Sequence, residues 1–367
     1  MSTAKNGFYK LIGALDAQLY IGGLGILIVV IILWSPFGLK IPDYAEGWGN
    51  LSVVQGFHVM KSDFTTSRPL VYFPWKVAYL LSRDSFIGAR LVLAALFWGK
   101  AFALYAILRK MCLANAVLAF LIAILFILHP ADQGNLILRA LGRHFAVFLY
   151  VVSVLFMVLA CQRSNPLYLI GMLIAEGASA LASEQGLPLI LFTPLVLLLC
   201  KECSKSKKVK ITLWWFGVLA LSIFNFITAD KQHQAAAFDG SRTGISQFIQ
   251  EVLLSNLIAY RRLFFDGWQT ALKWALDFQT PYFYFAIAIT LATGLTAWLL
   301  SRLAGEQEKQ INIGRYFVVL ILAGLAIIGL SFFPYSITTA RYDGLRVFYY
   351  AAAGAALVTG IIFFKIC

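Results

Sequence analysis

The sequence predicts an all-α protein, a polytopic bundle of transmembrane helices that forms a single domain over residues 1–367. Hydrophobic residues make up 60% of the chain and charged residues only 13%, whereas soluble domains carry about 25% charged residues. The mean hydropathy is +0.80. A water-soluble domain of this size would not stay dispersed with such a composition, so we expect the chain to lie largely within a membrane.

Apolar windows recur along the whole chain, and many approach the ~20 residues that a helix needs to cross a bilayer. Together they predict about ten spans, some of them short. The windows cover residues 19–37, 86–108, 113–128, 145–161, 167–181, 187–200, 211–228, 283–300, 316–333 and 348–364.

The distribution of basic residues predicts the orientation in the membrane. The chain has 30 Lys and Arg against 17 Asp and Glu, a formal net charge of +13. In a membrane protein such an excess indicates cytoplasmic loops and anionic lipid rather than nucleic acid. With the N-terminus inside, each cytoplasmic connection carries basic residues, which predicts a multi-pass protein with both termini in the cytoplasm. We expect the membrane to be the bacterial inner membrane. These connections are Arg109–Lys110, Arg163, residues 201–210, residues 302–315 and Lys365.

Under this orientation all five cysteines lie at cytoplasmic ends of spans. The outer face then holds no disulfide, and none is expected. Cys200 and Cys203 have no second cysteine pair, so we expect no zinc site there. The sequence contains no Walker or dinucleotide glycine motif for ATP or nicotinamide. The histidines show no metal-ligand spacing; they are His58, His129, His144 and His233.

The outer face is predicted to carry the two large loops, residues 38–85 and 230–280. Each contains a segment whose pattern is typical of a helix lying in the headgroup region. Residues 71–81 combine Trp75 and Tyr79 with aliphatic side chains. In the second loop apolar residues repeat at helical spacing; these are Ile245, Phe248, Ile249, Val252 and Leu253.

Asp43 lies where the chain leaves the first predicted span, at the start of the first outer loop. A solvated loop acid is the commoner explanation for such a residue. Cations at the outer ends of several spans favour a catalytic role, because a bundle could bring them together around one anionic group beside Asp43. Arginine suits this role, since its planar fork binds phosphate oxygens in a bidentate way. The cations are Arg68, Lys76, Arg143, Arg341 and Arg346.

Polar residues also interrupt the apolar windows. Residues 183–186 (Ser-Glu-Gln-Gly) separate two short spans, and they form either a simple polar turn or part of a site. Lys100 and Glu176 lie deeper, within apolar windows. We predict that they pair as a structural ion pair, because charges inside a membrane normally find partners.

Four segments, in this order along nearly the whole chain, resemble the GT-C superfamily of integral-membrane glycosyltransferases, especially the protein O-mannosyltransferase branch that carries tetratricopeptide repeats. This sequence lacks those repeats. It also has Asp43-Tyr44 where that branch has a paired acid, and Glu184-Gln185 where it has Lys-Glu, so the acceptor specificity of the branch is not carried over. The four segments are Asp43 with Ser67-Arg-Pro-Leu70, His129-Pro130 to Gly142-Arg143, Ser183-Glu-Gln185, and Arg341 to Gly354 with Arg346, Tyr349 and Tyr350.

The resemblance implies transfer of a sugar from a polyprenyl-phosphate donor to an acceptor hydroxyl on the extracytoplasmic side, with inversion. Asp43 would be the base, and cations would stabilise the departing phosphate. No cofactor is implied, and a divalent metal is left open. The partners expected are the lipid-linked sugar, membrane lipid and other membrane proteins. The substrate-binding candidates are Arg68, Lys76, Arg143, Glu184, Arg341, Arg346 and Tyr349.

Two other functions remain open from the sequence. A secondary transporter would place its substrate near the bilayer midplane, where Lys100 and Glu176 are expected, although the large outer loops argue against it. A non-catalytic subunit of a membrane complex would keep the same helical shell for packing against a partner.

Overall fold

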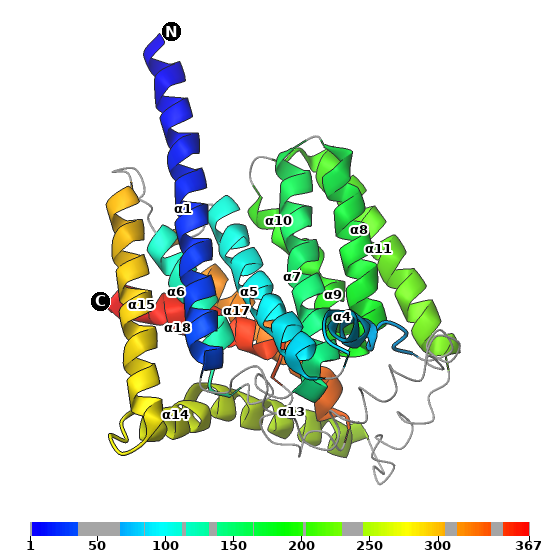
Figure 1. The fold of residues 1–367 in the computed structure, drawn as a ribbon. Helices are drawn as coiled ribbons and strands as arrows, with labels where there is room; N and C mark the ends of the chain where they lie inside the picture. Colours follow the sequence, from blue (N-terminus) through cyan, green and yellow to red (C-terminus); the bar gives the residue numbers. More distant parts are fainter. Residues whose placement is uncertain are drawn as a thin grey trace.

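The computed structural model describes residues 2–35, 67–83, 85–111, 115–131, 138–163, 165–200, 203–229, 245–304, 314–338 and 348–366. Within these ranges the regular elements are all helices (Figure 1). This confirms the predicted all-α class. Six of the helices are long and apolar enough to cross a membrane, as expected for a polytopic protein. They are α1 (Ser2–Trp34), α5 (Ile87–Lys110), α7 (Leu141–Gln162), α11 (Lys205–Thr228), α15 (Pro281–Leu303) and α17 (Gly314–Ser336).

Two predicted windows, residues 167–181 and 187–200, form a sharply bent pair of helical segments, which is either a broken span or a re-entrant loop. We call this pair the broken span. Helix α8 and the segment that follows it pass the same length and hydropathy test together, but they are bent by 113°. α6 (Ala116–Leu128) and α18 (Ala351–Ile366) are apolar but shorter. The predicted total of about ten spans therefore stays a prediction. The broken span consists of α8 (Pro166–Ala182), η4 (Glu184–Gly186), α9 (Leu187–Phe192), η5 (Thr193–Leu195) and α10 (Val196–Leu199).

Local sequence explains where the broken span starts and stops. The Asn165 side chain caps α8 by accepting from the Leu167 backbone N–H at 2.9 Å, and Pro166 occupies the first turn, where its missing N–H costs nothing. At the other end Ser183 adopts an extended backbone with φ −160°. Pro188 and Pro194 then keep the following helical pieces short. The break places Glu184 and Gln185 at the junction.

Helices also form in both predicted outer loops. They are α4 (Phe73–Leu81), α13 (Ile245–Arg261), the π-helical turn η6 (Arg262–Asp266) and α14 (Gly267–Ala275). Figure 1 shows α13 and α14 lying across one end of the upright helices, the end where α1 finishes. The α13 face toward α17 is buried at Ala259, and the Tyr260 hydroxyl donates to the Leu325 carbonyl at 2.8 Å. That these helices lie in the membrane interface stays a prediction.

The loop before α4 contacts both α7 and α8. The Leu70 backbone N–H donates to the Leu181 carbonyl at the end of α8, at 3.2 Å. Gly142, at the start of α7, approaches the Val71 carbonyl so closely that any Cβ there would collide with it. A glycine is therefore required at residue 142. These two contacts hold Arg68 beside the start of α7 and the end of α8.

Cys161 and Cys203 form a disulfide, with Cα atoms 5.3 Å apart across a sequence separation of 42 residues. Cys200 is buried in the same apolar cluster. No disulfide is expected from the sequence, which places Cys161 and Cys203 at cytoplasmic ends of spans, and the Cys200/Cys203 motif suggests no partner for Cys203; the structure corrects this expectation. The pairing arises because the end of α7 packs beside the start of α11, as the contact from Lys207 Nζ to the Arg163 carbonyl at 2.9 Å also shows.

The predicted ion pair between Lys100 and Glu176 is wrong. Both side chains are buried, but Lys100 Nζ contacts His144 Nδ1 at 3.4 Å, whereas both carboxyl oxygens of Glu176 lack a hydrogen-bond partner among the described residues. The reason is the order of the helices: α7 packs against both α5 and α8 and lies between them (Figure 1). Lys100 on α5 therefore faces α7 and not α8.

Candidate functional site

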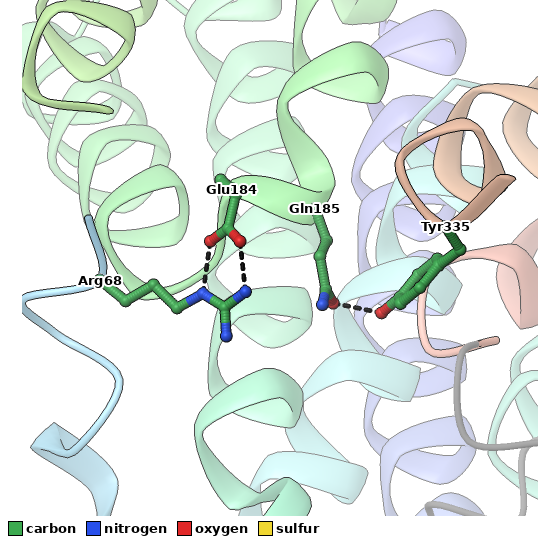
Figure 2. Close-up of polar contacts among 4 residues, drawn as sticks. All are labelled: Arg68, Glu184, Gln185 and Tyr335. Atoms are coloured by element: carbon green, nitrogen blue, oxygen red, sulfur yellow. Dashed lines mark hydrogen bonds and ion pairs between the residues drawn. The ribbon is translucent and has the colours of Figure 1, made fainter. Parts of the chain in front are cut away.

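Arg68 and Glu184 form a bidentate ion pair where the loop before α4 meets the broken span (Figure 2). Arg68 Nε donates to Glu184 Oε2 at 2.5 Å, and Nη2 donates to Oε1. Burial opposes the positive charge, but the hydrogen bond to Glu184 and its negative charge outweigh burial and raise the pKa of Arg68. One edge of the guanidinium, formed by Nε and Nη2, is therefore occupied by a carboxylate in this structure.

The residue after Glu184 contacts a third element. The hydroxyl of Tyr335, near the end of α17, donates to Oε1 of Gln185 (Figure 2). Both side chains are buried, with 4% of Tyr335 and 7% of Gln185 exposed. A buried phenol needs such a partner. The junction between α8 and α9 is thus connected to the loop before α4 on one side and to α17 on the other.

Arg143, on the first turn of α7, contacts Tyr349. Its Nη1 donates to the Tyr349 hydroxyl at 3.4 Å, and its guanidinium carbon lies 5.4 Å from the centre of the Tyr349 ring. The negative charge of Glu184 also acts on Arg143 electrostatically. The two groups of contacts therefore belong to one cluster. We call Arg68, Glu184, Gln185, Tyr335, Arg143 and Tyr349 the polar cluster.

Lys100 and His144 extend the polar cluster into the bundle. Both are fully buried. The Lys100 ammonium lies 4.0 Å from the centre of the Phe97 ring and 4.9 Å from that of Phe126. The His144 ring packs edge to face on Tyr349, with ring centres 5.0 Å apart and an interplanar angle of 82°. Aromatic faces stabilise a desolvated cation, which explains how a lysine is kept at this depth.

An apolar cavity of about 140 Å³ begins one helical turn from the polar cluster. Three residues that line the cavity lie close in sequence to members of the polar cluster. Val147 and Leu189 come one helical turn after Arg143 and Gln185, and Tyr350 is the residue next to Tyr349. The cavity extends to Met111 and Leu199, near the opposite ends of α5 and α10. It therefore reaches along the helices from a charged, hydrogen-bonding end toward the other side of the bundle.

The structure brings together four of the predicted site residues, Arg68, Arg143, Glu184 and Tyr349. Lys76 lies half-buried on α4 and does not belong to the polar cluster. The candidate base Asp43 and the candidate cations Arg341 and Arg346 lie outside the described residues. Among the residues that the structure describes, His, Cys, Asp and Glu form no group that could hold a metal ion.

The sequence does not single out Tyr335 and His144 as site residues, and it marks Gln185 only within the polar break at residues 183–186. For Lys100 it predicts a different partner. A basic residue inside an apolar window is itself a signal of function. That signal marks Lys100 in the sequence, but it does not show which residue Lys100 contacts. Tyr335 carries no such signal, because a tyrosine near the end of an apolar helix is common in membrane proteins.

His129, which caps the end of α6, is expected to make stability depend on pH. Burial lowers its pKa from 6.5 to about 4. In the unfolded chain His129 is therefore protonated below pH ~6.5, whereas in the folded protein it is protonated only below pH ~4. Stability is complete above this window and falls through it as the pH decreases, by roughly 3 kcal/mol for this residue alone.

The measurement is thermal unfolding of wild type and His129→Asn in detergent between pH 4 and pH 8. Asparagine can still accept from the Ala131 backbone N–H, which His129 Nδ1 binds at 3.3 Å, but it does not titrate. The variant should lose part of the wild-type pH dependence. Parallel curves for the two proteins would contradict the assignment.

The described residues define a multi-pass membrane protein whose regular elements are helices, with a buried polar cluster next to an apolar cavity. Comparison with known protein families finds no family model that matches the chain, and comparison with curated proteins finds no match. The GT-C resemblance thus rests on the sequence motifs alone and stays a prediction.

Proposed function

We propose that this protein is a membrane glycosyltransferase that moves a sugar from a polyprenyl-phosphate donor to an acceptor hydroxyl on the extracytoplasmic side. The observation that supports this best is the junction of the polar cluster with the apolar cavity. A ligand that fits both parts has an anionic head and an apolar chain. A lipid phosphate has this chemistry, and a soluble nucleotide sugar does not.

Arg143 is the described cation that suits the donor phosphate. Arg68 is already bound in a bidentate way by Glu184, whereas the Arg143 hydrogen bond to a neutral tyrosine is long, at 3.4 Å. A phosphate oxygen would be a stronger acceptor than that hydroxyl. Arg346 remains a second candidate on the basis of the sequence.

The apolar chain of the donor would use the cavity. A cavity of about 150 Å³ holds a ligand the size of benzene, so the 140 Å³ observed here suits one short segment of an isoprenoid chain. The rest of the chain would lie in lipid. Tyr150 and Tyr350 are the lining residues with hydroxyl groups, and the Tyr150 hydroxyl is bonded to Thr193 at 3.0 Å.

The reaction is a single displacement at the anomeric carbon, which inverts its configuration. The acceptor oxygen forms the new bond as the bond to the phosphate oxygen breaks. The acceptor proton passes to a carboxylate, for which Asp43 is the candidate, and the departing phosphate keeps the electron pair. General-base catalysis of this kind contributes about 10² to 10⁴-fold, and fixed cations stabilise the charge that develops on the leaving group.

Filling the cavity should weaken donor binding. Ala353→Leu places three more carbon atoms against the cavity, so we expect the KM for a synthetic polyprenyl-phosphate sugar to rise about tenfold, the effect of ~1.4 kcal/mol. A donor with a truncated chain should show a smaller change. Ala220→Leu on the exposed face of α11 is the matched control and should leave KM unchanged.

The same purified proteins should be analysed by mass spectrometry for bound lipid. A lipid-linked sugar in wild type that is depleted in Ala353→Leu supports the proposal. Equal KM values for both variants and wild type would show that the donor does not use this cavity. A protein that carries no such lipid, is inert with every donor and purifies with a large membrane complex would instead be a non-catalytic subunit.

A further inference from the structure

We propose that Lys100 is a positioning residue that fixes the tautomer of His144 and, through His144, the place of Tyr349 in the polar cluster. The inference rests in its functional part on the transferase proposed above. Its structural part stands on contacts among three elements: α5, α7 and the residues just before α18.

The donor and acceptor in the contact between Lys100 and His144 follow from chemistry. We take Lys100 to be an ammonium, as its place against the faces of two aromatic rings favours; an ammonium has hydrogens to donate and no lone pair. Its Nζ lies 3.4 Å from Nδ1 of His144, so Nδ1 must be the acceptor and carries no proton. The single proton of the neutral ring is then on Nε2. Lys100 thus selects one of the two tautomers of a fully buried histidine.

The orientation of His144 is passed on to Tyr349. The imidazole is held between Phe97, with ring centres 4.8 Å apart, and the Tyr349 ring at 5.0 Å. Tyr349 is only 2% exposed, so its ring is tightly packed. If the His144 ring turned, it would collide with the Tyr349 ring and push it out of place. The Tyr349 hydroxyl and ring are the groups that Arg143 contacts. A rotated imidazole would therefore displace the cation that we assign to the donor phosphate.

A positioning role for Lys100 can be separated from a structural one by a substitution that removes the charge and keeps the volume. Taking an ammonium out of water is costly, so removing the charge need not destabilise the fold. Methionine has a similar length and no charge. Lys100→Met should consequently fold with an unchanged or higher Tm, whereas a lysine required for the fold would lower Tm when replaced.

The first measurement is the ¹⁵N spectrum of histidine-labelled protein, in which His144 is assigned by its loss in His144→Gln. Wild type should show Nδ1 without a proton and Nε2 with one. Lys100→Met should show a mixture of tautomers. Lys110→Met, at the other end of the same helix, should match wild type. A proton on Nδ1 in wild type, or an unchanged spectrum in Lys100→Met, would overturn the proposal.

The second measurement is sugar transfer from a synthetic polyprenyl-phosphate donor. Misplacement of a catalytic group by about 1 Å can cost roughly 10²-fold, so Lys100→Met should lower kcat by about 10 to 100-fold with a smaller change in KM. Unchanged kcat in a variant with altered tautomers would overturn the positioning role. An inert wild type would overturn the proposal that the protein is a transferase. The ¹⁵N spectrum would still decide whether Lys100 orients His144.

Discussion

Asp43→Asn is expected to slow sugar transfer by about 10² to 10⁴-fold while the protein still folds and still binds its lipid donor. Asparagine keeps the shape and much of the hydrogen-bonding capacity of aspartate but cannot accept the proton of the acceptor hydroxyl. Only the step that needs a base should therefore suffer. The measurement is single-turnover transfer, with donor binding and thermal unfolding followed in parallel.

Glu46→Gln is the matched control for this prediction. It removes a carboxylate from the same outer loop, three residues further along, and its effect should be mild. The sequence predicts that both acids lie in a solvated loop, and surface changes usually alter stability by about 0.5 kcal/mol or less, so neither variant is expected to unfold. A fully active Asp43→Asn would show that another group accepts the proton.

Arg143→Lys should reduce transfer by about 10² to 10³-fold, the loss typical of one missing donor to a developing negative charge. The Arg143 guanidinium stacks on the Tyr349 ring and at the same time donates to its hydroxyl. A lysine ammonium is a point charge on a flexible chain and cannot form both contacts while binding two phosphate oxygens. The measurement is kcat and KM with the synthetic donor.

Arg163→Lys provides the comparison for Arg143, because Arg163 lies immediately after the opposite end of the same helix. Its replacement should leave transfer unchanged. If Arg143→Lys also turns over at the wild-type rate, Arg143 serves only as an anchor at the membrane interface. The comparison requires that both variants keep the thermal stability of the wild type. Arg163 is exposed, so its replacement should not lower the stability.

The sequence alone determined the class of the protein and the positions of most of its helices. The reason is that in a bilayer each spanning helix must be apolar and must satisfy its own backbone hydrogen bonds, so the information is local. Residues 86–108, 145–161 and 211–228 correspond closely to α5, α7 and α11. The polar break at residues 183–186 was visible for the same reason, since a run of polar residues cannot continue an apolar span.

Only the tertiary structure decided which polar residues meet. Arg68 and Glu184 are 116 positions apart in the chain, and Arg143 and Tyr349 are 206 apart; no local pattern encodes such distances. Lys100 shows the difference most clearly, because its burial follows from the apolar window around it, while its partner depends on which helix packs beside α5. Since α7 lies between α5 and α8, Lys100 contacts His144 and Glu176 is left apart. Side-chain pairing in a bundle is a property of helix order, and helix order is fixed by packing between spans.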